Sequence, residues 1–264
     1  MRAVLYDFPG PDARRRSSLI TALFIMLIAL LAIWVIVSLR QSGMLDARLW
    51  YALLDPNLVQ LLVSGLLSTM KVAAVSMILS IIGGAMLAAC LLLFKQTWVR
   101  VLLRSWIEVF RGLPLLLLIF FIYLGGPGIG VQISTFWALV LGIVLYNSAV
   151  IAEIFRAGIL ALPRGQSEAG AAIGLSASEI FRLILLPQSV RNMLPALISQ
   201  LVVLIKETSL GFIVGYAEFL RDARTAVEFL GGSYSLPVYT VVAVVYIAVN
   251  CALSWLARHL QPML

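Results

Sequence analysis

Residues 19–39 read LITALFIMLIALLAIWVIVSL, a stretch without a single ionisable side chain. At about 1.5 Å of rise per residue, an α-helix of this length spans roughly 30 Å, the thickness of the hydrocarbon core of a bilayer. Two more charge-free runs follow at Val72–Phe94 and Gly112–Ala152. The second is long enough for two passes, because residues 125–130, GGPGIG, should break any helix. The sequence therefore predicts an all-α, polytopic membrane helical bundle.

The composition supports this fold class. The 264 residues are 62% hydrophobic and only 12% charged, about half the charged fraction of a soluble domain. Six spans are predicted, near residues 18–39, 62–94, 103–125, 132–155, 193–216 and 237–257. The first is too long for a cleaved signal peptide and lacks a small-residue cleavage site after it. Cys90 and Cys251 fall within spans as small apolar fillers, so neither a metal nor another cofactor is expected.

The basic residues divide unevenly between the two sides of the predicted bundle. The side of the N-terminus receives most of them: Arg14, Arg15, Arg16, Lys95, Arg100, Arg104, Arg156, Arg164, Arg182, Arg191 and Arg258. The other side receives only Arg40, Arg48, Arg221 and Arg224. Because cytoplasmic loops are enriched in Lys and Arg, both termini are expected in the cytoplasm. The net charge of +7 then reflects topology and requires no nucleic acid partner.

The longest predicted cytoplasmic loop, between the fourth and fifth spans, contains residues 165–188, GQSEAGAAIGLSASEIFRLILLPQ. A short helix is expected over about 166–173, with Glu168 in its first turn, where the helix dipole favours an anion. Four small residues follow that glutamate: Ala169, Gly170, Ala171 and Ala172. A helix with so little relief lets another backbone approach closely. These residues alone leave a plain interfacial connector equally open.

A turn and a second helix are expected next. Gly174 supplies the left-handed residue that ends the first helix, and Leu175 makes the closing contact. Ser176 and Glu179 have the spacing of a capping box for the second helix. Pro187 is expected to end that helix. The pattern predicts a helix-turn-helix that lies outside the lipid.

This loop resembles the "EAA" loop of ABC importer permeases in Glu168-Ala169-Gly170, in Gly174, and in residues 184–187, ILLP. Gly170 replaces the second alanine of the family pattern and keeps its small size. The resemblance implies a coupling helix that docks into a groove on an ATPase subunit. The residues expected to make that contact are Glu168, Ala169, Gly170, Ala171, Gly174, Leu175, Ser176, Glu179 and Pro187.

Other stretches are similar to the polar amino acid permeases of the histidine, glutamine and glutamate group. They are Glu108–Leu116, Leu145–Ala149, Ala152–Gly158 and Lys206–Leu210. The match covers roughly residues 62–257, so we expect a permease core at 58–264. Residues 1–57 would add a cytoplasmic leader, one extra span and an outer loop. Residues 4–11, VLYDFPGP, look similar to glutamate-uptake permeases of actinobacterial type.

The resemblance implies partners that the chain lacks in itself. None of the three lysines follows a glycine in a phosphate-binding G-x-x-x-x-G-K-[ST] loop, so the chain is not expected to be an enzyme. Two ATP-binding subunits inside, a second permease chain (a paralogue or another copy), and an extracellular amino acid-binding protein are implied. The expected location is a bacterial plasma membrane, and the best candidate substrate is glutamate.

Charged residues within the spans mark candidate pathway positions, because ionisable groups in a bilayer face protein or water. Lys206 and Glu207 are expected near mid-membrane, about 100° apart around their helix, so they cannot neutralise each other. With Thr208, Ser209 and Asn147 they are candidates for a pathway or a gate. An equally open alternative is that Lys206 holds the partner permease.

Two more candidates, Arg111 and Glu153, lie near the inner ends of spans. For these, local ion pairs are favoured over substrate contact, with Glu108 and Arg156 respectively as partners. Two other classes of protein stay open from the residues alone. One is an ion-coupled carrier that acts alone with a glutamate as proton relay, and the other is a membrane scaffold or sensor.

Overall fold

The computed structural model describes residues 10–94 and 96–260. Most of the leader motif at 4–9, and Lys95, lie outside the described residues. The elements are α1 (Pro11–Gln41), α2 (Ala47–Tyr51), η1 (Ala52–Leu54), α3 (Pro56–Leu93), α4 (Thr97–Gly112), α5 (Leu115–Gly128), α6 (Thr135–Leu160), α7 (Arg164–Ala172), α8 (Ala177–Glu179), η2 (Ile180–Leu185), α9 (Leu186–Glu207), η3 (Thr208–Phe212), α10 (Phe219–Leu230), η4 (Gly232–Tyr234) and α11 (Ser235–Leu260).

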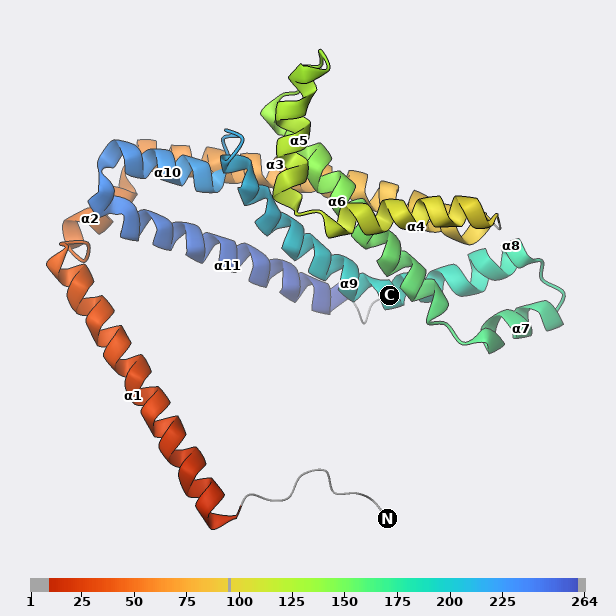
Figure 1. The fold of residues 1–264 in the computed structure, drawn as a ribbon, viewed down its shortest axis with the longest axis horizontal. Helices are drawn as coiled ribbons and strands as arrows, with labels where there is room; N and C mark the ends of the chain where they lie inside the picture. Colours follow the sequence, from red (N-terminus) through yellow and green to blue (C-terminus); the bar gives the residue numbers. More distant parts are fainter. Residues whose placement is uncertain (1–9, 95, 261–264) are drawn as a thin grey trace.

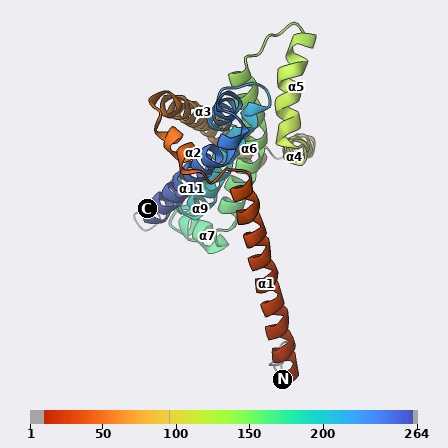
Figure 2. The same ribbon diagram turned by 90° about the vertical axis from the view of Figure 1, so that its left-hand side faces the viewer.

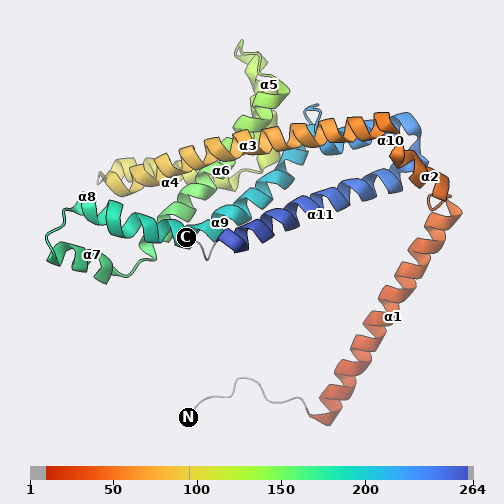
Figure 3. The same ribbon diagram turned by 180° about the vertical axis from the view of Figure 1, so that it is seen from behind.

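The long helices α3, α6, α9 and α11 run lengthwise through one bundle (Figure 1). The short helices α7 and α8 lie at one end, which we call the α7 end, and α2 and α10 lie at the opposite, α10 end (Figure 3). α5 packs on α6 while its far end projects from the bundle (Figure 1), and α1 leaves from the α10 end (Figure 1) and points away from all the other helices (Figure 2). Within residues 10–94 and 96–260, five helices are long and apolar enough to cross a membrane, or up to six if the bent pair α4 and α5 is one span.

The core forms around α6. Its residues Leu139, Val140 and Ile143 are fully buried against α3, α5 and α9. Small residues permit this close packing, since a Cβ added to Gly84 of α3 would lie 2.6 Å from Cγ2 of Ile151 on α6. The core of the bundle therefore depends on glycine at the α3–α6 crossing.

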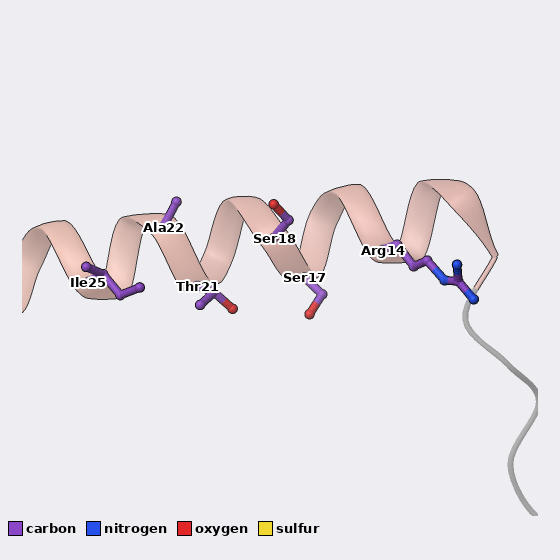
Figure 4. A pocket seen from close by; sticks show the side chains of 6 residues that line it. All are labelled: Arg14, Ser17, Ser18, Thr21, Ala22 and Ile25. Atoms are coloured by element: carbon purple, nitrogen blue, oxygen red, sulfur yellow. The ribbon is translucent and has the colours of Figure 1, made fainter.

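In contrast, α1 has no buried residue in its most apolar stretch. Figure 4 shows a shallow hollow along one face of this helix, near its N-terminus. All six residues that line it come from α1 itself: Arg14, Ser17, Ser18, Thr21, Ala22 and Ile25. The hollow is thus a feature of a lone helix surface and encloses no space between elements.

The third predicted span is wrong as a single straight helix over 103–125. The chain bends by 97° between α4 and α5, because Leu113 precedes Pro114 and takes an extended conformation. The predicted break at 125–130 is also displaced. α5 continues to Gly128 with Pro127 in its last turn, and the chain leaves the helix only beyond that point.

The prediction that Pro187 ends a helix is wrong as well. Pro187 lies in the first turn of α9, which begins at Leu186 rather than near residue 193. The preceding segment η2 is a π-helix, in which Leu186 N donates to the carbonyl of Phe181. A π turn is wider than an α turn, and this relieves the clash between a proline ring and the carbonyl four residues back. The chain therefore stays helical from Ala177 to the end of η3.

Candidate functional site

The first candidate feature is the hairpin formed by α7, α8 and η2, which we call the α7–η2 hairpin (residues 164–185). Gly170 of α7 is buried, and a Cβ added there would lie 2.8 Å from Cγ1 of Ile180 and 2.9 Å from Cδ1 of Ile184. The glycine that departs from the family pattern thus allows the two arms to pack together. Glu168 lies beyond the first turn of α7, which begins at Arg164, so its predicted place in the first turn is wrong.

The turn of the hairpin has the predicted chemistry. Gly174 has a φ of 84°, in the left-handed region that favours glycine. The backbone N–H of Leu175 donates to the carbonyl of Gly170 at 3.1 Å, which closes the end of α7. The capping box is confirmed, because Ser176 N donates to Glu179 Oε2 at 2.8 Å and the serine hydroxyl accepts from Glu179 N at 3.4 Å. These bonds fix the angle between the two arms.

The hairpin exposes large apolar side chains beside charged ones such as Glu168 and Arg182. Ile173 is 76% exposed and Leu183 is 66% exposed, while Ala169 and Ala171 are also exposed. The hairpin lies at the α7 end of the bundle (Figure 3), and burial of its apolar side chains against another molecule would remove them from water. Such a surface is suited to contact with another protein.

The second feature is a polar cluster between α6 and α9, which we call the amide cluster: Asn147, Gln200 and Glu207. Asn147 is fully buried and its Nδ2 donates to Glu207 Oε2 at 2.8 Å. Gln200 Nε2 donates to Asn147 Oδ1. Gln200 and Glu207 are two helical turns apart and so share one face of α9. The structure brings together two predicted residues and adds Gln200, whose seven-residue spacing from Glu207 was the available signal.

The other predicted pathway residues on this segment lie around the cluster. Lys206 is exposed, and none of the salt bridges found among residues 10–94 and 96–260 includes it. Thr208 is buried and its hydroxyl donates to the Ile205 carbonyl at 2.7 Å. Ser209 donates likewise to the Lys206 carbonyl. Both hydroxyls are therefore occupied by the backbone in this conformation, and Lys206 alone keeps an available charge.

The third feature is a cavity of about 290 Å³ between α4 and α6, which we call the charged pocket. It is lined by Arg104, Ile107, Glu108, Arg111, Glu153 and Arg156. The predicted pair of Glu153 and Arg156 is confirmed, with Nη2 of the arginine 2.8 Å from Oε2 of the glutamate. The pair predicted between Glu108 and Arg111 is absent from the salt bridges in the described ranges. The structure separates Arg111 and Glu153 from the amide cluster, in a site of their own.

A fourth polar group, which the sequence analysis missed, lies at the α10 end. Glu218 is fully buried and caps α10, where its carboxylate accepts from Leu220 N at 2.9 Å and from Arg221 N at 2.7 Å. This residue lies between the candidate spans of α9 and α11. Burial raises the pKa of the Glu218 carboxyl to about 7. Its hydrogen bonds serve the cap, so we assign it a structural role.

A multi-span helical bundle with polar groups between its spans and an exposed hairpin at one end fits a membrane permease. Known proteins support this class. The model of the family "binding-protein-dependent transport system inner membrane component" matches residues 80–264. The probable glutamine ABC transporter permease of Bacillus subtilis is 35% identical over 198 residues, which cover 75% of this chain and 90% of the relative.

The glutamate transport system permease of Corynebacterium glutamicum is 36% identical over 235 residues, covering 86% of this chain and 83% of the relative. Among solved structures, a chain of an amino acid ABC transporter crystallised with histidines is 30% identical with a TM-score of 0.73 and covers 78% of this chain and 95% of that chain. A chain of an inward-facing methionine ABC transporter, at 19% identity and a TM-score of 0.63, covers 78% of this chain and 98% of that one and supports the fold alone.

The chain belongs to this family of inner membrane components and is the permease subunit of an ABC importer for polar amino acids. It is a multi-pass membrane protein and not an enzyme, because the ATPase of an ABC transporter is a separate subunit. The family context implies an ATPase and a binding protein as partners. A carrier that acts alone and a scaffold are both set aside by this membership.

Proposed function

We propose that this permease imports glutamate. The observation that carries the proposal is the extent of similarity to the Corynebacterium glutamate permease. That match spans 86% of the chain, more than the predicted core at residues 58–264 contains. The similarity therefore extends into the region of the extra N-terminal helix, whereas the match to the glutamine permease covers 75% of the chain. We also propose the division of the chain into an N-terminal part at residues 1–57 and a permease core at 58–264.

The α7 end is proposed to face the cytoplasm, with both termini on that side. Arg164 and Arg182 lie in the α7–η2 hairpin, whereas Arg221 and Arg224 lie in α10 at the opposite end. The excess of basic residues on the cytoplasmic side of membrane proteins supports this orientation.

The α7–η2 hairpin is proposed to dock on the ATPase, in an assembly of two permease chains, two ATPase subunits and one external binding protein. The exposed Ile173 and Leu183 supply apolar contact area. The Gly174 turn and the Ser176 capping box hold the arms at a fixed angle, so a movement of the ATPase would reach α9 through η2. The amide cluster and Lys206 would then line or gate the path on α9.

The test is Gly174→Val in the complete transporter, reconstituted into proteoliposomes. A β-branched residue is strained at a φ of 84° and costs on the order of 1–3 kcal/mol, so the hairpin should change its angle. We expect ATP-driven glutamate uptake and stimulated ATP hydrolysis to be lost, while the permease still assembles and the binding protein still docks.

Gly165→Val is the matched control, because Gly165 lies in the same hairpin, has no positive φ, and has open space around its Cα. The control should transport normally. Normal uptake by Gly174→Val would contradict the coupling role of this turn. Uptake that follows an imposed proton gradient and ignores ATP would contradict the importer mechanism itself.

A further inference from the structure

The charged pocket is lined by five charged side chains, of which only Glu153 and Arg156 form an ion pair among the described residues. Glu153 and Arg156 bond each other at 2.8 Å and form one wall. Arg104, Glu108 and Arg111 line the same cavity, and no salt bridge within the described part of the chain includes them. Ionisable groups between membrane helices usually face a charged partner or a water-filled path. Two guanidinium groups and one carboxylate are therefore available to a ligand.

These three side chains are held in a fixed order by α4. Residues 104, 108 and 111 follow one another at spacings of four and three, so they share one face of the helix. Ile107, on the adjoining face, is only 2% exposed and packs in a core cluster with Ala149 and Ala152 of α6. The α4–α6 seam thus holds the charged face in place, with the carboxylate between the two guanidinium groups along the helix.

The size of the cavity is suited to a single amino acid. Its volume of about 290 Å³ is that of roughly ten water molecules in the liquid, at about 30 Å³ each. Glutamate and glutamine each contain about ten non-hydrogen atoms, and ligand pockets begin near this volume.

The charges of the three lining residues outside that ion pair, Arg104, Glu108 and Arg111, are the reverse of those of glutamate, which carries two carboxylates and one ammonium group. We propose that the charged pocket is a binding station for an acidic amino acid, in which Arg104 and Arg111 each bind a carboxylate and Glu108 binds the ammonium group. A guanidinium group binds a carboxylate through two parallel hydrogen bonds. Glutamine would leave one guanidinium group without its partner, so the station favours glutamate. This proposal rests on the proposed function.

The experiment measures equilibrium binding of radiolabelled L-glutamate and L-glutamine to the permease–ATPase complex in nanodiscs, without the external binding protein. We expect Arg104→Gln and Arg111→Gln each to weaken glutamate binding by about tenfold or more. The variant that loses the partner of the side-chain carboxylate should also reduce the preference over glutamine, whereas the other should weaken both ligands alike. Glu108→Gln should weaken both ligands alike, because both carry the ammonium group. Arg100→Gln is the matched control, one turn earlier on α4 and outside the cavity lining.

Uptake in proteoliposomes with the binding protein separates the two proposals. One contrary result is that the wild type imports glutamate while its glutamate binding is undetectable, and another is that Arg104→Gln, Arg111→Gln and Glu108→Gln all bind glutamate as the wild type does. Either result overturns the binding station and leaves the proposed glutamate import intact. If the wild type imports neither amino acid while its ATPase is active, the proposed function fails first. If Arg111→Gln does not assemble, Arg111→Lys takes its place, because lysine keeps the positive charge but cannot form the two parallel hydrogen bonds of a guanidinium group. Glutamate binding equal to wild type in that variant would overturn the station.

Discussion

Helices α1 and α6 are both long and apolar, yet they relate to the rest of the molecule in opposite ways. In the most apolar stretch of α1 no residue is buried, whereas 56% of the corresponding stretch of α6 is buried. The more apolar helix is the one without packing partners. Hydropathy predicts that a helix lies in the bilayer, but it does not predict whether the helix packs against other helices of the chain.

The difference lies in the size of the side chains. Gly142, Ala149 and Ala152 are among the buried residues of α6, and a Cβ on Gly142 would lie 2.6 Å from Cγ1 of Ile119 in α5. Residues 19–39 of α1 instead contain no glycine and consist mostly of large apolar side chains. In a bilayer, where apolar contact with lipid is as favourable as contact with a helix, close approach through small residues drives association.

The severest way to break this comparison is to remove a small residue from the core. Gly84→Val should prevent the α3–α6 packing, because even the first added carbon meets Ile151 at 2.6 Å. Overpacking of this kind costs about 1–3 kcal/mol or more, and we expect loss of the folded complex in thermal melts followed by intrinsic fluorescence. Ala29→Val in the exposed stretch of α1 is the control and should melt with the wild type.

A smaller effect is expected from the polar groups that α6 buries. Asn147→Leu keeps the size of the side chain but leaves Glu207 and Gln200 without their partner. A buried polar group without its hydrogen bond costs about 1–3 kcal/mol, so the melting temperature should fall and uptake should decline. An Asn147→Leu complex with wild-type stability would show that water replaces the lost hydrogen bonds and that the amide cluster contributes little to the free energy of folding.

A position that is exposed on a core helix sharpens the comparison further. Lys206→Met removes the charge and keeps most of the stem of an exposed side chain at the end of α9. If Lys206 lines the path, stability should change by less than about 0.5 kcal/mol while glutamate uptake falls steeply. The control is Arg40→Met, an exposed basic residue near the end of α1. A complex that dissociates instead would assign Lys206 to the contact between the two permeases.

The smallest effect is expected from α1. Replacing residues 19–39 by a Leu-Ala helix of equal length preserves the basic residues that set topology but erases the native surface. Because no residue of this stretch is buried, stability and uptake should both stay at the wild-type level, within about 0.5 kcal/mol for stability. Loss of assembly would reveal a partner for α1 in the complete transporter, and melting of the purified complex is the measurement.

The sequence predicts those features that depend on local chemistry. The predicted apolar spans place α1, α3, α6 and α11, and the residues around Gly174 and Ser176 specify a turn and a cap that need no distant contact. The bend before Pro114 was missed because the apolar run continues through it. α10 was missed because its buried residues recur on one face of a segment too polar to resemble a span.

The candidate sites follow the same division. Glu153 and Arg156 are three residues apart on one helix, so their pair was predictable from spacing. Gln200 was not predicted, because its role depends on Asn147, 53 positions away on another helix. The charged pocket likewise depends on how α4 packs on α6, and no pattern within either segment reveals it.

The π-helical segment η2 is a point at which the hairpin and α9 could change their relative rotation. Its hydrogen bonds span five residues where those of an α-helix span four, so the turn between the hairpin and α9 contains one extra residue. If pressure on the hairpin tightened this turn to α-helical geometry, the released residue would rotate α9 by about 100° and advance it by about 1.5 Å relative to the hairpin. The face that carries Gln200 and Glu207 would then turn away from Asn147. Pressure on the hairpin at the α7 end would thus become a rotation of α9 inside the bundle.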